Sequence, residues 1–238
     1  MSLLYIIRHG QASFFADDYD RLSEKGHEQA RVLGSYLREN GFEINEVYSG
    51  SLKRQIQTAE SCGETYCTDG KHWPETQILE GLNEYGADEV MSKLKNELIQ
   101  KHVHVRKLDD DYTNSKDDSE RYRTFHRLLE ALMQYYIADD YESTGFETWR
   151  QFHDRVTQAY KTIQTKEGNG RKIAVFTSGG PIGVSVQTCL NAPEQQAGEL
   201  NWRVYNASIT QFTFRADRIS LDQFNSISHL PKEMRSFR

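Results

Sequence analysis

Cysteine is scarce in this sequence, which has three thiols among 238 residues: Cys62, Cys67 and Cys189. The number is odd, and no pair has the spacing of zinc ligands, so a disulfide framework is disfavoured. We expect reduced thiols in a cytosolic protein. Cys62 and Cys67 fall near the end of a predicted helix, where helix packing explains them best.

Long apolar runs are also lacking. Residues 1–7 are mostly apolar, but Arg8 and His9 follow at once. A secretory signal begins with basic residues and continues for longer, and a membrane-spanning helix needs about 20 apolar residues. No later segment supplies such a run. We therefore expect a cytoplasmic location and no membrane partner.

Positive charge is in deficit, since 29 Lys and Arg residues face 35 Asp and Glu residues, for a net charge of -6. No long basic cluster is present. These features disfavour nucleic acid as a partner. A small phosphate pocket can still be locally positive in a chain of this net charge.

The apolar segments that are present alternate between two periodicities. Short strands are predicted at residues 3–7, 47–49, 77–79 and 172–177, and the apolar runs at 3–7 and 173–176 are typical of buried strands. Helical patterns follow them at residues 23–41, at 52–64 and from Gly179 onward. Residues 208–214 and 218–224 alternate apolar with polar side chains, which predicts a hairpin. The predicted fold class is α/β, a three-layer α/β/α sandwich around a mainly parallel sheet.

Residues 87–167 lack strand patterns and are predicted to form a helical insertion that covers one end of the sheet, within a single domain of residues 1–238. The polar run 109–118 is predicted to be a solvated loop rather than a metal site. His102 and His104 alternate as metal ligands on a strand do. With no third ligand nearby, we expect them to be solvent-exposed instead.

A candidate functional residue follows the first predicted strand. His9 lies where ligands bind open α/β sheets, just beyond the carboxyl end of a strand, and Gly10 follows it. Arg8 beside it carries a fork of donors that suits a phosphate. By itself the triplet Arg8-His9-Gly10 is weak support for a site.

Four further segments strengthen the case: Leu22–Ala30, Tyr48–Ala59, Leu79–Gly86 and the strand and glycines around Ser178. Together with Ile6–Gly10, they resemble the motifs of the histidine phosphatase superfamily, which includes phosphoglycerate mutases and acid phosphatases. The order and rough spacing agree across nearly the whole chain. The resemblance implies a phosphoryl-transfer enzyme whose substrate is a small phosphorylated molecule or a phosphoprotein.

The resemblance also implies a role for each residue type. His9 would be the nucleophile and form a phosphohistidine, with its other ring nitrogen held by a backbone carbonyl. Arg8 and Arg54 would bind the phosphoryl oxygens. Glu84 would protonate the leaving group and later activate water. No metal or other cofactor is expected, because the arginines supply the positive charge.

The last motif departs from the family pattern. Family members usually carry a second histidine where this chain has Ser178. A hydroxyl can donate one hydrogen bond to a phosphoryl oxygen but cannot carry positive charge. The N–H groups of Gly179 and Gly180, at a predicted helix start, would add anion binding. Loss of one transition-state donor typically costs about 10²–10³ in rate, so we expect a slow phosphatase.

The first motif departs as well. Ala12 and Phe15 stand where the mutases carry a hydroxyl residue and an asparagine, and Phe14 and Phe15 make the predicted pocket edge more apolar. This difference favours a phosphatase over a mutase.

Other functions stay open at this point. A catalytically weakened phospholigand-binding module would retain the arginines without needing Glu84. A serine hydrolase with Ser178 as nucleophile is less expected, because Phe176 stands where that motif requires glycine. The physiological substrate, the oligomeric state and the role of His229 do not follow from the sequence.

Overall fold

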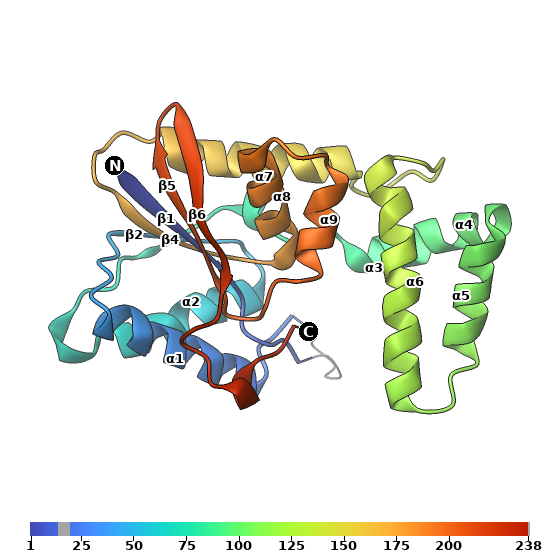
Figure 1. Ribbon diagram of the computed structural model, residues 1–238, viewed down its shortest axis with the longest axis horizontal. Helices are drawn as coiled ribbons and strands as arrows, with labels where there is room; N and C mark the ends of the chain where they lie inside the picture. Colours follow the sequence, from blue (N-terminus) through green and yellow to red (C-terminus); the bar gives the residue numbers. More distant parts are fainter. Residues whose placement is uncertain (14–19, 238) are drawn as a thin grey trace. The chain divides into compact units, whose positions relative to one another are not determined.

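The computed structural model describes residues 1–13 and 20–237. Two compact units are present: the first comprises Met1–Glu84 with Arg155–Arg238, and the second comprises Tyr85–Asp154. Figure 1 shows the sheet of the first unit and the helices of both. Each unit is described by itself below.

The first unit contains a six-stranded sheet in the order β3-β2-β4-β1-β5-β6. Its strands are β1 (Ser2–Arg8), β2 (Glu46–Ser49), β3 (Thr76–Ile78), β4 (Lys172–Thr177), β5 (Ile209–Arg215) and β6 (Arg218–Ser226). β1 to β4 run parallel to one another, β5 runs antiparallel to β1, and β6 pairs antiparallel with β5 in the predicted hairpin. The structure therefore confirms the predicted fold class, α/β around a mainly parallel sheet.

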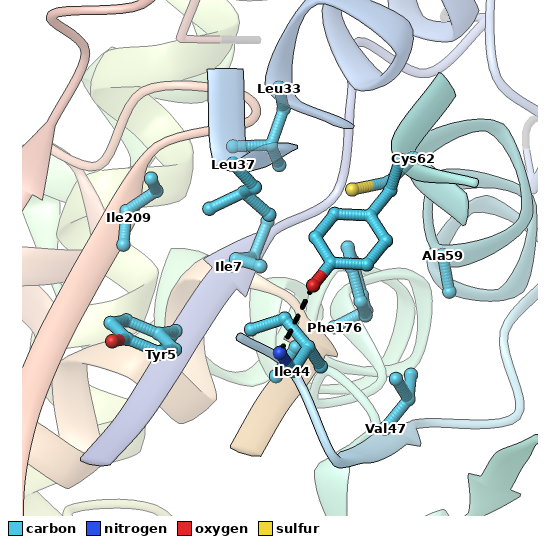
Figure 2. Close-up of a cluster of buried hydrophobic side chains, with 12 residues drawn as sticks. Tyr5, Ile7, Leu33, Leu37, Ile44, Val47, Ala59, Cys62, Phe176 and Ile209 are labelled. Atoms are coloured by element: carbon cyan, nitrogen blue, oxygen red, sulfur yellow. Dashed lines mark hydrogen bonds between the residues drawn. The ribbon is translucent and has the colours of Figure 1, made fainter. Parts of the chain in front are cut away.

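Helices cover both faces of this sheet (Figure 1). On one face, α1 (Glu24–Glu39) and α2 (Lys53–Tyr66) pack their apolar stripes against alternate strand residues such as Ile7 and Phe176. Figure 2 shows this cluster, with Leu33, Leu37 and Cys62 reaching it from the helices. The buried place of Cys62 agrees with the packing role expected for it.

A tyrosine closes the edge of the same cluster. The hydroxyl of Tyr66 accepts the N–H of Ile44 at 3.2 Å, drawn as the dashed line in Figure 2, and donates to the carbonyl of Phe42 at 2.7 Å. A buried hydroxyl with both partners costs little to desolvate, so it fixes the loop between α1 and β2. On the opposite face, α7 (Trp149–Thr165) and α8 (Gly179–Leu190) lie over Leu4 and Ile6.

The second unit is helical. It consists of α3 (Ala87–Glu89), a single π-helical turn at Val90–Leu94, α4 (Lys95–Lys101), α5 (Val103–Thr113), α6 (Asp118–Ala138) and the first turns of α7. None of the described residues 85–154 lies in a strand. The unit ends within α7 at Asp154, whereas the predicted insertion runs to residue 167. Among the described helices, none is long and apolar enough to span a membrane.

The prediction of a loop at residues 109–118 was wrong, because α5 continues to Thr113 and only 114–117 separate it from α6. Aspartate is a poor helix former, but tertiary contacts decide here. Val105 is buried, and the Lys95 ammonium lies 2.9 Å from the Asp109 carboxylate. Asp117 caps α6 by accepting the Glu120 N–H at 2.8 Å.

His102 and His104 are likewise at the start of a helix rather than alternating along a strand. Their rings lie 4.5 Å and 5.9 Å from the Tyr135 ring, measured between centroids. Within residues 1–13 and 20–237, no group of three His, Cys, Asp or Glu side chains is placed to hold a metal ion.

An ion pair joins β2 to the segment that leads into β4. The Arg171 guanidinium contacts the Glu46 carboxylate through two bonds, of 2.5 Å and 2.9 Å, and also donates to the carbonyl of Ile163 at 2.7 Å. The hydrogen bonds from Arg171 lower the pKa of Glu46 from 4.5 to about 2 against the opposing effect of burial. The pair therefore ties the end of α7 to the sheet.

We predict that Glu46→Gln lowers the free energy of unfolding by about 2 kcal/mol near neutral pH, because Arg171 is left buried without its anion. The folded-state pKa is below the unfolded value, so this contribution is complete above pH 4.5 and disappears as the pH falls toward 2. Urea denaturation of both proteins across this range measures it. A difference between them that does not change with pH would contradict the account.

Candidate active site

The site forms where the carboxyl ends of β1 and β4 lie side by side. Arg8 is opposite Thr177 in the parallel register, and the His9 N–H donates to the Thr177 carbonyl at 2.8 Å. This pairing places His9 next to Ser178. The strand order alone therefore brings together two segments that are far apart in the sequence, at the edge where open α/β sheets bind ligands.

His9 is held in one tautomer. Its Nδ1 lies 2.7 Å from the carbonyl oxygen of Gly10, and a carbonyl can only accept, so Nδ1 carries the proton. Nε2 then has a lone pair, and it accepts a hydrogen bond from Arg54 Nε at 3.3 Å. The backbone carbonyl that the sequence called for is thus present, and Nε2 is the nitrogen available for attack.

The surroundings also keep the ring neutral. Burial is the main reason that the pKa of His9 is well below its usual value of 6.5, and the charges of Arg54 and Arg8 lower it further. The hydrogen bond to Gly10 opposes this shift only in part. The His9 side chain is therefore an unprotonated imidazole beside two permanent cations, which is the form a nucleophile needs.

Close backbone packing supports this loop. A Cβ on Gly10 would lie 2.4 Å from the Gly26 carbonyl oxygen, so no larger residue fits between the loop and the start of α1. The Gly10 N–H donates to the Thr58 hydroxyl at 3.0 Å, and Gln29 accepts the Gln11 N–H at 2.8 Å. These contacts explain why the segment Leu22–Ala30 is one of the motifs that resemble the family, although none of its side chains is a proposed reacting group.

Both predicted phosphate-binding arginines are present and buried. Arg54 stands in the first turn of α2, and its Nη1 lies 2.6 Å from Oδ1 of Asp20. The other carboxylate oxygen of Asp20 accepts the Lys53 N–H at 2.8 Å. Arg8 donates through Nη1 to the carbonyl of Val204. The sequence analysis did not identify Asp20. In the sequence, it is marked only as a carboxylate three residues before Ser23, which caps α1.

Glu84 lies two residues after a 3₁₀ turn at Glu80–Leu82. Its Oε2 accepts the Gly180 N–H at 3.1 Å, so the amino end of α8 holds the carboxyl group. Gly180 had been predicted to bind a phosphate anion together with Gly179. In this structure, Gly180 binds Glu84. Gly179 is the first residue of α8 and packs against the Asn201 side chain.

A second residue that the sequence reasoning missed positions the acid segment. Arg155 donates to the carbonyl oxygens of Gly81 at 3.2 Å, Asn83 at 2.8 Å and Glu84 at 3.2 Å. Three carbonyls that converge on one guanidinium fix the backbone that carries Glu84. Arg155 lies in α7, inside the predicted insertion, and no local motif marked it.

Ser178 is fully buried, with 0% of its surface exposed. Its hydroxyl accepts a hydrogen bond from Gln55 Nε2 at 2.8 Å. The hydrogen bonds of His9 go to Gly10 and Arg54, so they do not pair the imidazole with Ser178. This arrangement gives no support to a serine nucleophile, which needs an adjacent base.

The open question of His229 has a structural answer. Its Nε2 donates to the carbonyl of Ala207 at 3.0 Å, and its ring is tilted against the Tyr36 ring, with 5.3 Å between the centroids. Burial lowers the pKa of His229 to about 4.

Of the residues predicted at the pocket edge, Ala12 pairs with Leu22 in an isolated bridge. Phe14 and Phe15 lie outside the described residues.

We predict that His9 makes the fold sensitive to mild acid. The pKa of His9 is lower in the folded state than in the unfolded state. Below about pH 6.5, His9 is therefore protonated in the unfolded chain but not in the folded one, and the free energy of unfolding falls. From about pH 7 to about pH 5, this linkage amounts to as much as about 2 kcal/mol. His9→Gln should remove it. Denaturant titrations at the two pH values test this, and an equal loss in both proteins would contradict it.

Comparison with known proteins agrees with this geometry. The sequence model of the histidine phosphatase superfamily (branch 1) matches residues 4–144 and 123–227. A 2,3-bisphosphoglycerate-dependent phosphoglycerate mutase of Lactobacillus acidophilus is 33% identical over 110 residues, which are 38% of this chain and 48% of that protein. The match thus spans about half the length of this curated relative.

Solved structures share the fold over nearly the whole chain. YhfR of Bacillus stearothermophilus superposes with a TM-score of 0.66 at 18% identity, over 96% of this chain and 99% of that one. A mycobacterial glucosyl-3-phosphoglycerate phosphatase, solved with inorganic phosphate, gives a TM-score of 0.64 at 18% identity, over 97% and 100% of the two chains. At such identities, the likeness concerns the fold alone.

Proposed function

The chain belongs to the histidine phosphatase superfamily (branch 1), and on this premise we propose that it hydrolyses phosphate monoesters through a phosphohistidine on His9. The observation that carries the proposal is the state of His9: a buried, neutral imidazole with Nδ1 fixed by Gly10, beside two arginine side chains. Phosphoryl transfer needs such a nucleophile next to groups that neutralise the phosphoryl oxygens.

In the first step, the Nε2 lone pair of His9 attacks phosphorus. A nitrogen–phosphorus bond forms, the ester oxygen–phosphorus bond breaks, and the leaving alkoxide takes a proton from Glu84. Arg8 and Arg54 neutralise the charge on the three phosphoryl oxygens, so the proposed reaction involves no metal or cofactor. Displacement of Arg54 Nε from His9 by the incoming phosphoryl group would free the lone pair for this attack.

In the second step, water attacks the phosphohistidine. Glu84, now a carboxylate, takes a proton from this water, the nitrogen–phosphorus bond breaks, and His9 returns to its neutral form. The hydrogen bond between Gly10 and Nδ1 keeps the same tautomer throughout. Inorganic phosphate and the alcohol are the products.

We favour hydrolysis over mutase chemistry because Ala12 replaces the hydroxyl residue that mutases carry after the first motif. The proposed substrate class is a small phosphorylated molecule or a phosphoprotein, and we propose a cytoplasmic location, which the three separate thiols support. Mutase activity is the alternative to test, because the mutase of Lactobacillus acidophilus resembles part of this chain.

We predict metal-independent hydrolysis of p-nitrophenyl phosphate at mildly acidic to neutral pH, with the rate unchanged by EDTA. His9→Ala should reduce it to background, because the substitution removes the proposed nucleophile. Colorimetric release of p-nitrophenol measures both proteins. Arg31→Ala, a surface change on α1, serves as the control and should retain the wild-type rate.

Three results would count against this proposal. Interconversion of phosphoglycerates that requires a bisphosphorylated primer would identify a mutase. Binding of inorganic phosphate without turnover of any ester would identify a binding module. Turnover that persists in His9→Ala would place the nucleophile elsewhere.

We predict that Glu84→Gln separates good from poor leaving groups. p-Nitrophenolate leaves without much help from an acid, whereas an alkoxide needs a proton in the transition state. The variant should therefore lose about 10²–10³ in kcat with an alkyl phosphate and clearly less with p-nitrophenyl phosphate. Steady-state kinetics with both esters decide the matter, and equal losses would exclude Glu84 as the acid.

A further inference from the structure

One buried side chain contacts two segments of the candidate site and has no assigned role. Gln55 follows Arg54 in α2 and is fully buried, with 0% of its surface exposed. Its Nε2 donates to the Leu82 carbonyl at 3.2 Å and to the Ser178 hydroxyl at 2.8 Å. Because the Leu82 carbonyl only accepts, the amide nitrogen must face it, and both N–H groups are then used.

These two bonds connect three segments that carry proposed reacting groups. Leu82 lies two residues before Glu84, and Ser178 precedes the helix whose Gly180 N–H holds the Glu84 carboxylate. Gln55 itself is covalently joined to Arg54. The Thr177 hydroxyl adds a second bond to the Leu82 carbonyl at 2.6 Å. The Gln55 amide therefore links the helix that carries Arg54 directly to the segment that carries Glu84.

The backbone nearby makes room for this amide. A Cβ on Gly50 would lie 2.0 Å from Gln55 Oε1, so a larger residue at this position would displace the Gln55 amide. Gly50 in turn donates its N–H to the Phe176 carbonyl at 3.2 Å, which fixes the loop after β2 to β4. The site around Gln55 is thus closely packed, and a side chain of another shape would disturb it.

Ser178 has no exposed surface, so its hydroxyl cannot reach a phosphoryl oxygen without leaving its place. We propose that Gln55 and Ser178 form a buried clamp that positions Glu84 relative to Arg54, and that Ser178 acts through this clamp rather than on the substrate. Gln55 is a positioning residue in this account. The inference rests on the proposed phosphatase function and concerns how the same site is held together.

The clamp is tested with Gln55→Met, which retains the length of the side chain and removes both donors. Gln57→Met is the matched control: it lies on the same helix, and its Oε1 accepts the Leu22 N–H at 2.9 Å, away from the acid segment. We expect Gln55→Met to lower kcat at least about tenfold with an alkyl phosphate and less with p-nitrophenyl phosphate, since a displaced Glu84 impairs leaving-group protonation. A merely structural defect would lower both rates equally.

Binding of inorganic phosphate distinguishes the clamp from direct contact. Ser178→Ala and Gln55→Met should each leave the inhibition constant of phosphate within about twofold of wild type, because neither side chain touches the anion. The double variant should be no slower than Gln55→Met alone, since both changes break one unit. A severalfold weaker phosphate affinity in Ser178→Ala would overturn the proposal, as would Gln55→Met kinetics that match those of Gln57→Met.

Failure of the proposed function gives a different result, namely no His9-dependent hydrolysis in the wild-type protein. In that case, calorimetric titration of phosphate into wild type and Ser178→Ala still decides the question. Equal affinities support a serine that does not touch the anion, and a weaker affinity in the variant overturns the clamp.

Discussion

Two guanidinium groups beside a buried imidazole set the chemistry of this site. Cations at this depth are costly to desolvate, and the structure offsets the cost with fixed partners: Asp20 for Arg54 and the Val204 carbonyl for Arg8. The same cations, together with burial, make a third positive charge on His9 unfavourable. A neutral imidazole beside two cations, which the proposed phosphoryl transfer requires, therefore follows from one electrostatic arrangement.

The sheet topology supplies the framework for this arrangement. Parallel pairing of β1 with β4 places His9 beside Ser178, and the helices that follow β2 and β4 begin at the same edge. The segment that carries Glu84 follows β3, and its Leu79 N–H still donates to the Ser49 carbonyl of β2 at 2.8 Å. It depends on Arg155, which holds three carbonyls from Gly81 to Glu84, and on Gln55 at Leu82. Beyond Leu79, the segment with Glu84, the proposed acid, is therefore held largely by side chains, whereas His9, the proposed nucleophile, is held by the backbone.

This difference explains what the sequence could predict. Buried strands, the Ser23 cap and the motifs around His9 and Arg54 are local patterns, and the structure has each where it was expected. Asp20, Gln55 and Arg155 escaped notice because each acts on a partner far along the chain: Arg54 is 34 residues from Asp20, Ser178 is 123 from Gln55, and Glu84 is 71 from Arg155. The loop predicted at 109–118 was wrong because a local pattern was followed where tertiary packing decides: the polar composition favoured a loop, but packing of α5 makes most of the segment helical.

The central claim is that His9 carries the phosphoryl group, and trapping that intermediate tests it most directly. The protein is mixed with p-nitrophenyl phosphate and quenched in alkali, in which phosphohistidine survives, and its peptides are then analysed by mass spectrometry. The account predicts a phosphoryl group on the peptide that contains His9, bonded to Nε2 by ³¹P NMR and absent from His9→Ala. A phosphoryl group on Ser178, or turnover with no phosphorylated protein at any time, would contradict it.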